Sequence, residues 1–510
     1  MNPILQILVV LMILLYTGAL GFIFLYSLTQ ADLLFRYLFY KKKYTSDQQP
    51  KTLFSTLPFV TVQLPIYNEK YVAERLIDCV AKLDYPRDKF EIQVLDDSTD
   101  ETFDIIANKV RQLNGVVNIH HVHRITRTGY KAGALKEGLQ KAGGELITIF
   151  DADFLPGKNF LRKTVPHFID QNVGMVQTRW SWLNKSYSLL TKVQAFALDS
   201  HFSIEQVGRN IAGSFINFNG TAGTWRKSCI LDAGNWEADT LTEDLDLSYR
   251  AQLKNWKFIY LEEVDAPSEL PPVMSAVKTQ QYRWNKGGAE TARKHIGQVI
   301  RSNKPLHMKW HGVMHLLTSG VFVCVFVFSL LSIPMLWIQH WFPQYSNVFR
   351  ISDVFFCGFY ILVALFFASV AIGQKNKWTA VVLFFKSFPF FLSLSMGLSL
   401  HNAIAVLEGY FGRKTPFIRT PKFNVIARSD QWTENKYMKR KVNKLTIAEA
   451  LLAVYFVGGI YLSYQFNNYS LLPFHILLAL GYGAVVYFSF FQTSARPVKK
   501  RLFVESREAA

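Results

Sequence analysis

The sequence predicts an α/β domain inserted between transmembrane helices. Residues 52–284 alternate strand-like and helix-like stretches joined by short turns, which is typical of a largely parallel sheet covered by helices. Long uncharged runs lie on both sides of this region, and the first covers residues 1–31. Of the 510 residues 50% are hydrophobic and 15% are aromatic, which is rich for a soluble enzyme.

The first 45 residues are expected to form a transmembrane helix with a basic flank. The span runs from about Ile4 to Leu28, and it lacks the basic start and cleavage site of a signal peptide. The lysines at 41–43 follow it and mark the cytosolic side. The net charge of +18 is therefore attributed to topology and lipid contact, because no nucleic-acid recognition motif is present.

Four further spans are expected after the α/β domain. Two lie within residues 312–374, one ending near Trp337 and one over 354–374. Two more lie within 447–495, separated by a polar break at 467–470. Five spans place the N-terminus outside and the basic tail, 496–510, in the cytosol.

Two intervening segments are expected at the membrane surface. Residues 285–311 read as an amphipathic interfacial helix. Residues 378–446 are expected to hold interfacial helices and the gating loop. Their apolar part, 378–411, must begin and end in the cytosol for the topology to close, and it carries Lys386, His401, Glu408 and Pro389. Interfacial helices or a re-entrant turn fit this part, 378–411, better than a crossing.

Acidic side chains follow the predicted strands of the α/β domain. Strands are expected at 59–64, 90–95 and 145–150, and helices at 69–83 and 99–113. Ligands of such sheets bind beyond the carboxyl ends of the strands, where Asp96-Asp97 and Asp151-Ala152-Asp153 lie. Dinucleotide-binding and P-loop glycine motifs are absent from the sequence.

The Asp151-Ala152-Asp153 motif suits a hard divalent cation. Carboxylate oxygens are ligands for Mg²⁺ or Mn²⁺, which would neutralise a diphosphate leaving group. An isolated motif of this kind is more often a solvated turn, but its position at a strand end and the accompanying motifs favour a site.

Two later motifs add a base and a cation. Thr242-Glu243-Asp244 stands at a predicted helix start, where Thr242 could cap the helix while Asp244 serves as a general base. In Gln280-Gln281-Tyr282-Arg283-Trp284, arginine can pair with pyrophosphate and tryptophan can stack on a sugar. Taken alone, this second motif could equally be an interfacial anchor.

Together the motifs resemble family 2 glycosyltransferases. The ordered set also includes Pro65-Ile66-Tyr67-Asn68-Glu69, Asp96-Asp97-Ser98-Thr99-Asp100 and Lys131-Ala132-Gly133-Ala134-Leu135, and the resemblance covers about residues 55–425. Within that family the motifs most resemble the processive, membrane-integrated branch that contains cellulose, hyaluronan and mannan synthases. Within this branch they look most like the glucomannan and xyloglucan-backbone type. The resemblance implies a GT-A (Rossmann-like) catalytic domain on the cytosolic side and dependence on Mg²⁺ or Mn²⁺.

The resemblance also implies a role for each matching residue. Asp244 would be the catalytic base, with Glu243 beside it. The residues implied for the nucleotide-sugar are Tyr67, Glu69, Asp97, Lys131, Asp151, Gln280 and Arg283. Asp151 and Asp153 would hold the metal, while Trp284, Gly220 and Thr221 would meet the acceptor. Phe417, Thr420 and Lys422 match the family's cytosolic gating loop.

The expected function is inverting transfer of a hexose from GDP-mannose or UDP-glucose to a growing polysaccharide, with passage of the product through the membrane. Single addition to a lipid acceptor is the alternative, and a non-catalytic scaffold or channel is a remote one. The expected partners are the donor, a glycan or lipid acceptor and membrane lipids, without nucleic acid. The expected location is the inner or plasma membrane of a bacterium, or a Golgi-type membrane of a eukaryote.

Two further features are left without a function. His120, His121 and His123 lie on a predicted strand whose neighbouring residues face opposite sides, and structural or surface roles are favoured. Trp180 and Trp182 suit either sugar stacking or core packing. The four cysteines are far apart in the sequence and indicate neither a disulfide framework nor a metal site.

Overall fold

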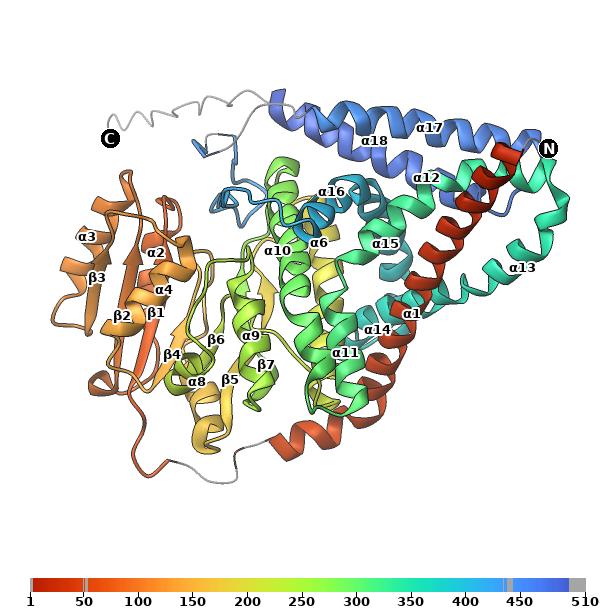
Figure 1. Cartoon of the computed structure of the whole chain (residues 1–510). Helices are drawn as coiled ribbons and strands as arrows, with labels where there is room; N and C mark the ends of the chain where they lie inside the picture. The colour runs from red at the N-terminus through yellow and green to blue at the C-terminus, as the bar shows by residue number, and fades with distance from the viewer. Residues whose placement is uncertain (1–2, 49, 51–53, 434, 438–443, 495–510) are drawn as a thin grey trace, which may run out of the picture.

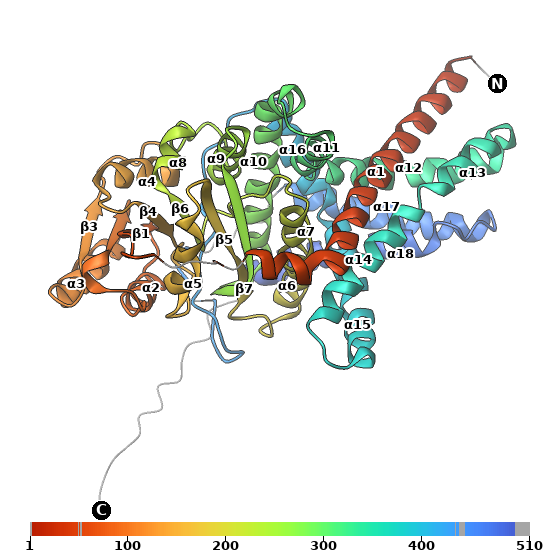
Figure 2. The same ribbon diagram turned by 90° about the horizontal axis from the view of Figure 1, so that it is seen from below.

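The computed structural model describes residues 3–48, 50, 54–433, 435–437 and 444–494. The described residues form one seven-stranded sheet in the order β3-β2-β1-β4-β6-β5-β7. The sheet domain lies to one side of the long apolar helices in both views (Figure 1, Figure 2). The strands are β1 (Val60–Ile66), β2 (Phe90–Asp96), β3 (Ile119–His123), β4 (Leu146–Ile149), β5 (Val173–Trp182), β6 (Gly223–Arg226) and β7 (Lys257–Ser268).

The sheet is parallel in its first half and mixed in its second. Strand β1 pairs in parallel with β2 and with β4, and β2 pairs in parallel with β3. Strand β6 runs antiparallel to both β4 and β5, while β5 and β7 are parallel. The strands predicted at 59–64, 90–95 and 145–150 are therefore neighbours, and their carboxyl ends meet at one edge of the sheet.

Helices cover both faces of this sheet, as the alternating pattern predicts. One buried cluster joins β1 to α2 and includes Val62 and Ile77, and a second joins α4 to β4 and β6 and includes Leu135 and Trp225. The helices of the domain are α2 (Ala73–Val80), α3 (Thr102–Leu113), α4 (Tyr130–Lys141), α5 (Phe160–Thr164), α6 (Leu189–Ser200), α7 (Gln206–Ile211), α8 (Lys227–Asp232) and α9 (Glu243–Leu253).

The remaining helices form the apolar part of the molecule. Helix α1 packs against α12 and α14, α18 packs against α15 and α17, and α16 packs along α10. The bounds are α1 (Pro3–Gln48), α10 (Met274–Arg301), α11 (Leu306–Leu316), α12 (Gly320–Trp341), α13 (Ser346–Val354), α14 (Cys357–Ile372), α15 (Lys377–Gly397), α16 (Ser399–Tyr410), α17 (Leu445–Gln465) and α18 (Leu472–Ser494).

In the described part of the chain, five helices are long and apolar enough to cross a membrane. They are α1, α12, α15, α17 and α18. Five spans were also expected from the sequence, but the set of helices differs, since α15 takes the place of the span expected at 354–374. Residues 354–374 were expected to cross, whereas α14 has only 16 residues because a turn at 355–356 separates it from α13.

The segment 378–411 was expected to stay at the membrane surface, yet α15 meets the length and composition of a span. Lys386 and Pro389 are both contained in its 21 residues without ending the helix. The rest of the segment forms a separate helix, α16, which carries His401 and Glu408 and packs along α10. Length and composition therefore favour α15 over α14 as a span.

The amphipathic helix begins earlier than predicted. Helix α10 starts at Met274, inside the predicted catalytic domain, and ends at Arg301, and α11 follows as a separate helix. The Gln280–Trp284 motif therefore lies within the first part of α10. The predicted tail, 496–510, lies outside the described residues.

Candidate active site

A cavity opens beyond the carboxyl ends of β1, β2 and β4. The start of α9, the first part of α10 and the loop at 417–422 complete its walls. Of the residues that the resemblance implies for the donor, the metal, the acceptor, catalysis and the gating loop, all except Thr221 line it: Tyr67, Glu69, Asp97, Lys131, Asp151, Asp153, Gly220, Glu243, Asp244, Gln280, Arg283, Trp284, Phe417, Thr420 and Lys422. Thr221 is fully buried, and its hydroxyl accepts a hydrogen bond from the backbone N–H of Asp151. Thr221 therefore holds the end of β4 in place instead of facing the cavity.

Lys131 links two sides of the cavity. Its ammonium group donates to Asp151 Oδ1 and, over 2.8 Å, to the backbone oxygen of Gly220. Burial would lower the pKa of this lysine, but the Asp151, Glu243 and Asp244 carboxylates raise it above its usual value. Lys131 is therefore a fixed positive charge at the centre of an acidic group.

Asp244 approaches the backbone where a glycine allows it. Gly220 has a φ of +81°, and a Cβ atom there would lie 2.9 Å from Asp244 Oδ2. Burial in the cavity and the neighbouring Glu243 carboxylate raise the pKa of Asp244 to about 7. A carboxylate with this pKa can accept a proton from a hydroxyl near neutral pH. Thr242 does not cap α9, since its hydroxyl bonds to that of Thr291 and not to the start of the helix.

The Asp153 carboxylate has one oxygen ready for a cation. Its side chain is 2% exposed, and Oδ2 lies 2.8 Å from Nζ of Lys422. Its Oδ1 atom is buried without a hydrogen-bond partner among the described residues. A buried carboxylate oxygen of this kind is costly unless a donor or cation meets it, so this residue fits a bound divalent ion.

Two arginines flank Asp97. Arg124 donates two hydrogen bonds to its carboxylate, at 2.7 and 2.6 Å. The guanidinium of Arg127 lies 3.8 Å from the same carboxylate and 3.4 Å from the centroid of the Tyr67 ring. This corner of the cavity combines an aromatic face, a cation and a carboxylate, which suits a planar base with hydrogen-bond donors.

The loop at 417–422 enters the cavity and bonds to its walls. Arg419 pairs with Glu69 at 2.7 Å, and Thr420 accepts a hydrogen bond from Arg283 at 3.0 Å. The Phe417 ring stacks on Tyr130 at 5.4 Å. Nε of Arg283 is buried and, within the described residues, has no acceptor. The Nε–H group of Arg283 is therefore available to donate a hydrogen bond to an anion.

The structure adds cavity residues that the sequence motifs did not single out. They include the charged residues Arg127, Arg419 and Glu269, and the two tryptophans of β5, Trp180 and Trp182, also line the wall. Glu269 accepts the backbone N–H groups of Phe423 and Asn424, and burial raises its pKa to about 7. Arg419 stands between Phe417 and Thr420, so its place in the predicted gating loop is the signal by which the sequence could have identified it.

Comparison with known proteins agrees with this arrangement. A family described as "Glycosyltransferase like family 2" matches residues 58–287, which is the sheet domain with its motifs. A solved mannosyltransferase from Pyrobaculum calidifontis, in complex with GDP-Man and Mn²⁺, is 18% identical with a TM-score of 0.45. The alignment covers 77% of this chain and 100% of the mannosyltransferase chain. A similarity at this level carries no argument about activity.

Curated relatives extend the match beyond the sheet domain. Glucomannan 4-beta-mannosyltransferase 9 of Arabidopsis thaliana is 33% identical over 84% of this chain and 81% of its own length. Glucomannan 4-beta-mannosyltransferase 1 of Oryza sativa subsp. japonica is 38% identical over 58% of this chain, and the chain spans 60% of that relative. Glucomannan 4-beta-mannosyltransferase 7 of Arabidopsis thaliana is 36% identical, with 65% of its length spanned. The chain therefore belongs to the family 2 glycosyltransferases, in the group that includes the glucomannan 4-beta-mannosyltransferases.

Proposed function

We propose that this chain is an inverting β-mannosyltransferase that moves mannose from GDP-mannose to the growing end of a β-linked polysaccharide. The observation that carries the proposal is the juxtaposition of Asp244 with Gly220 and Lys131 in the cavity that also holds Asp151 and Asp153. A base, a fixed cation and a pair of metal-ligating carboxylates are the groups that transfer from a nucleotide-sugar requires.

The proposed reaction is a single displacement. Asp244 takes the proton of the acceptor hydroxyl, whose oxygen forms a bond to C1 of the donor sugar. The bond between C1 and the diphosphate oxygen breaks, and its electron pair leaves with the nucleoside diphosphate. Attack from the face opposite the leaving group converts an α-linked donor into a β-linked product.

The other cavity residues would hold the donor. Asp153 and Asp151 would bind Mg²⁺ or Mn²⁺, which supplies positive charge beside the diphosphate. Gln280 and Arg283, whose Nε has no acceptor among the described residues, would donate to phosphate oxygens. Tyr67, Arg127 and Asp97 would receive the base, because guanine presents N–H donors that match the carboxylate of Asp97.

The choice of mannose rests on the relatives. Those that match over most of this chain are named as glucomannan 4-beta-mannosyltransferases, which supports a mannosyl donor and a β-1,4 linkage here. UDP-glucose remains the second donor to test. A second cavity shares Arg283 and Arg419 with the candidate active site and is lined by residues of α17 and α18, such as Thr446 and Phe488, which supports release of the product into a membrane path.

The test uses the whole chain in lipid nanodiscs with radiolabelled GDP-mannose or UDP-glucose and Mn²⁺ or Mg²⁺. We expect an alcohol-insoluble polymer from GDP-mannose that β-1,4-mannanase digests, and none from Asp244→Asn. Asp88→Asn is the matched control and should keep full activity, because Asp88 is exposed and precedes the amino end of β2, at the opposite end of that strand from the cavity. Polymer formed only from UDP-glucose would show that the donor is UDP-glucose and not GDP-mannose. Label only in lipid-extractable species would favour single addition to a lipid, and no transfer from either donor by folded protein would contradict the proposed activity.

A further inference from the structure

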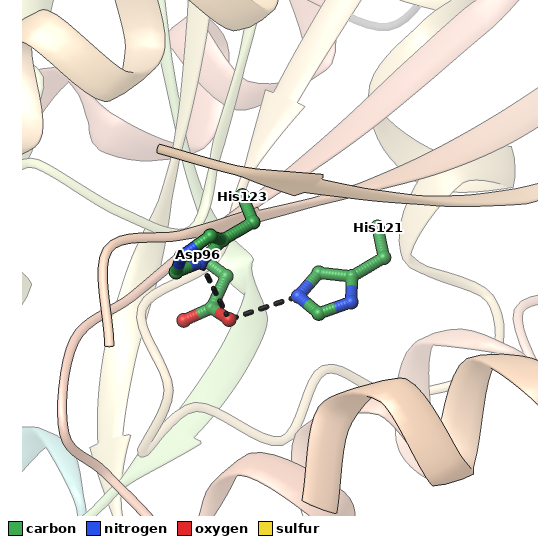
Figure 3. Close-up of side chains that lie close together, drawn as sticks. All are labelled: Asp96, His121 and His123. Atoms are coloured by element: carbon green, nitrogen blue, oxygen red, sulfur yellow. Dashed lines mark hydrogen bonds and ion pairs between the residues drawn. The ribbon is translucent and has the colours of Figure 1, made fainter. Parts of the chain in front are cut away.

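Two histidines and an aspartate meet at the outer edge of the sheet. His121 and His123 lie on the edge strand β3, and Asp96 is the last residue of the neighbouring strand β2 (Figure 3). Residues two apart on a strand face the same side, so both imidazoles point toward one place. The register pairs Asp96 directly with His123 and brings its carboxylate between the two rings.

The distances within this cluster suit a small metal ion. Asp96 Oδ2 lies 2.8 Å from His121 Nε2 and 3.4 Å from His123 Nδ1. The three atoms all lie within 4.8 Å of one another. Ligand bonds of about 2.0–2.1 Å at tetrahedral angles place neighbouring ligand atoms about 3.3 Å apart. Small movements of the imidazoles would therefore bring all three atoms into coordination.

The surroundings hold the ligands in place and leave one side open. The Phe103 ring of α3 packs against His121 at 5.1 Å and against His123 at 4.7 Å. The Asp96 carboxylate is fully buried, and its Oδ1 accepts the backbone N–H of Ser98. The side chains of His121 and His123 are 15% and 33% exposed, so an ion has access from solvent.

We propose that His121, His123 and Asp96 form a binding site for a divalent transition-metal ion of the Zn²⁺ class. Three protein ligands with two imidazoles suit Zn²⁺ over Mg²⁺, which prefers oxygen ligands, and leave a fourth position to water. Within the described residues, none of the three lines the candidate active-site cavity. The site is therefore distinct from Asp151 and Asp153, and it does not depend on the proposed transferase activity.

The ion would lie next to the donor cavity. Asp96 precedes Asp97, which lines the cavity, and the hydroxyl of Ser98 accepts the backbone N–H of Asn68 at the end of β1. A bound ion would fix Asp96 and, through Ser98, the connection between the ends of β1 and β2. The bound ion would therefore stabilise the wall of the cavity that the ends of β1 and β2 form, without lying in the cavity itself.

The experiment measures zinc bound to the whole chain in nanodiscs, after tag removal and chelator treatment. Equilibrium dialysis at micromolar free Zn²⁺ is done with millimolar Mg²⁺ present, which occupies oxygen-ligand sites. We expect one zinc per chain, and binding at least about tenfold weaker in His121→Asn/His123→Asn. His120→Asn is the matched control, because the neighbouring His120 lies beside Glu91 at 3.7 Å and is not a proposed ligand. Equal zinc binding by wild type and the double variant would overturn the proposal, as would no zinc bound by wild type.

Co²⁺ provides a second readout that separates ligand loss from misfolding. Wild type should develop the visible absorption bands of four-coordinate Co²⁺, and His123→Gln should not, although its thermal midpoint without metal is unchanged. His123 is the most exposed ligand, so its replacement perturbs packing least. Bands of equal intensity in wild type and His123→Gln would contradict coordination by this residue.

Discussion

The ammonium Nζ of Lys422 lies 2.8 Å from Oδ2 of Asp153, so the loop at 417–422 places a cation on the Asp-x-Asp motif. The two side chains are 17% and 2% exposed, which makes this a largely desolvated ion pair. A divalent ion that uses Asp153 must share this carboxylate with Lys422 or displace it. The loop and the metal are therefore linked through one carboxylate.

Lys422→Met is expected to raise the affinity for Mn²⁺ in the absence of donor by roughly tenfold, which is about 1.4 kcal/mol, because a competing cation is removed. Electron paramagnetic resonance of free Mn²⁺ in a titration measures this affinity. Lys414→Met, an exposed lysine close to the same loop, should leave it unchanged. Weaker Mn²⁺ binding by Lys422→Met would show that the lysine supports the ion and does not compete with it.

Gly220→Ala is expected to lower the transfer rate by about 10- to 100-fold, because the added Cβ displaces the Asp244 carboxylate. The positive φ also costs about 1 kcal/mol of stability. Gly213→Ala is the matched control, since Gly213 has a φ of +61° but a Cβ added there would meet no described atom within 4 Å. Thermal midpoints and initial rates are measured for both variants. We expect similar losses of stability and a loss of activity only at Gly220, and equal rates in the two variants would contradict a steric role.

The rate of transfer is expected to rise with pH up to about 7 and then level off. Asp244 acts as a base only when deprotonated, and burial with the Glu243 charge raises its pKa to about 7. The rate should therefore fall about tenfold per pH unit below this value. Glu243→Gln removes the neighbouring negative charge, so the midpoint of the profile should shift to lower pH. A pH–rate profile of both proteins tests the assignment, and a midpoint that stays in place or moves to higher pH would argue against it.

The raised pKa of Asp244 also makes the folded protein less stable as pH rises, whereas the transfer rate increases with pH. The folded pKa of Asp244 lies above its ordinary value of 3.8, so ionising this group in the folded state costs free energy. The cost is absent below pH 3.8 and grows as pH rises toward 7. Asp244→Asn is therefore expected to raise the thermal midpoint at pH 8 and to change it little at low pH. An unchanged midpoint at pH 8 would show that Asp244 ionises at no cost.

Lys278→Met is expected to destabilise the protein by about 3 kcal/mol, because it leaves Glu449 buried without its counter-ion. Lys278 Nζ lies 2.6 Å from Glu449 Oε2, and the Glu449 side chain is 0% exposed. The pair ties α10 to the start of α17. Lys278→Met/Glu449→Met should recover most of the loss, as a thermal-shift assay in detergent can measure. If the double variant is no more stable than Lys278→Met, the loss does not come from an unpaired charge.

Much of the fold could be predicted because its signals are local. The buried strands β1, β2 and β4 are rich in apolar residues, and acidic residues follow β2 and β4 within one or two positions. Parallel strands place such positions at one edge, so Asp97 and Asp151 were expected together. The edge strand β3 was also expected, whereas the antiparallel β6 was not, since only Trp225 among its four residues is large and apolar.

The sequence by itself determined most of the motif residues that meet in the cavity and the presence of long apolar helices, because each motif and each apolar run is contiguous in the chain. The tertiary structure decided which side chains touch. The approach of Gly220 to Asp244, the pairing of Lys422 with Asp153 and the cluster of Asp96 with two histidines join residues far apart in the sequence. It also decided that a turn interrupts 354–374 whereas Pro389 leaves α15 continuous. Such contacts depend on strand register and helix packing, and hydrophobic periodicity reports only which face of an element is buried.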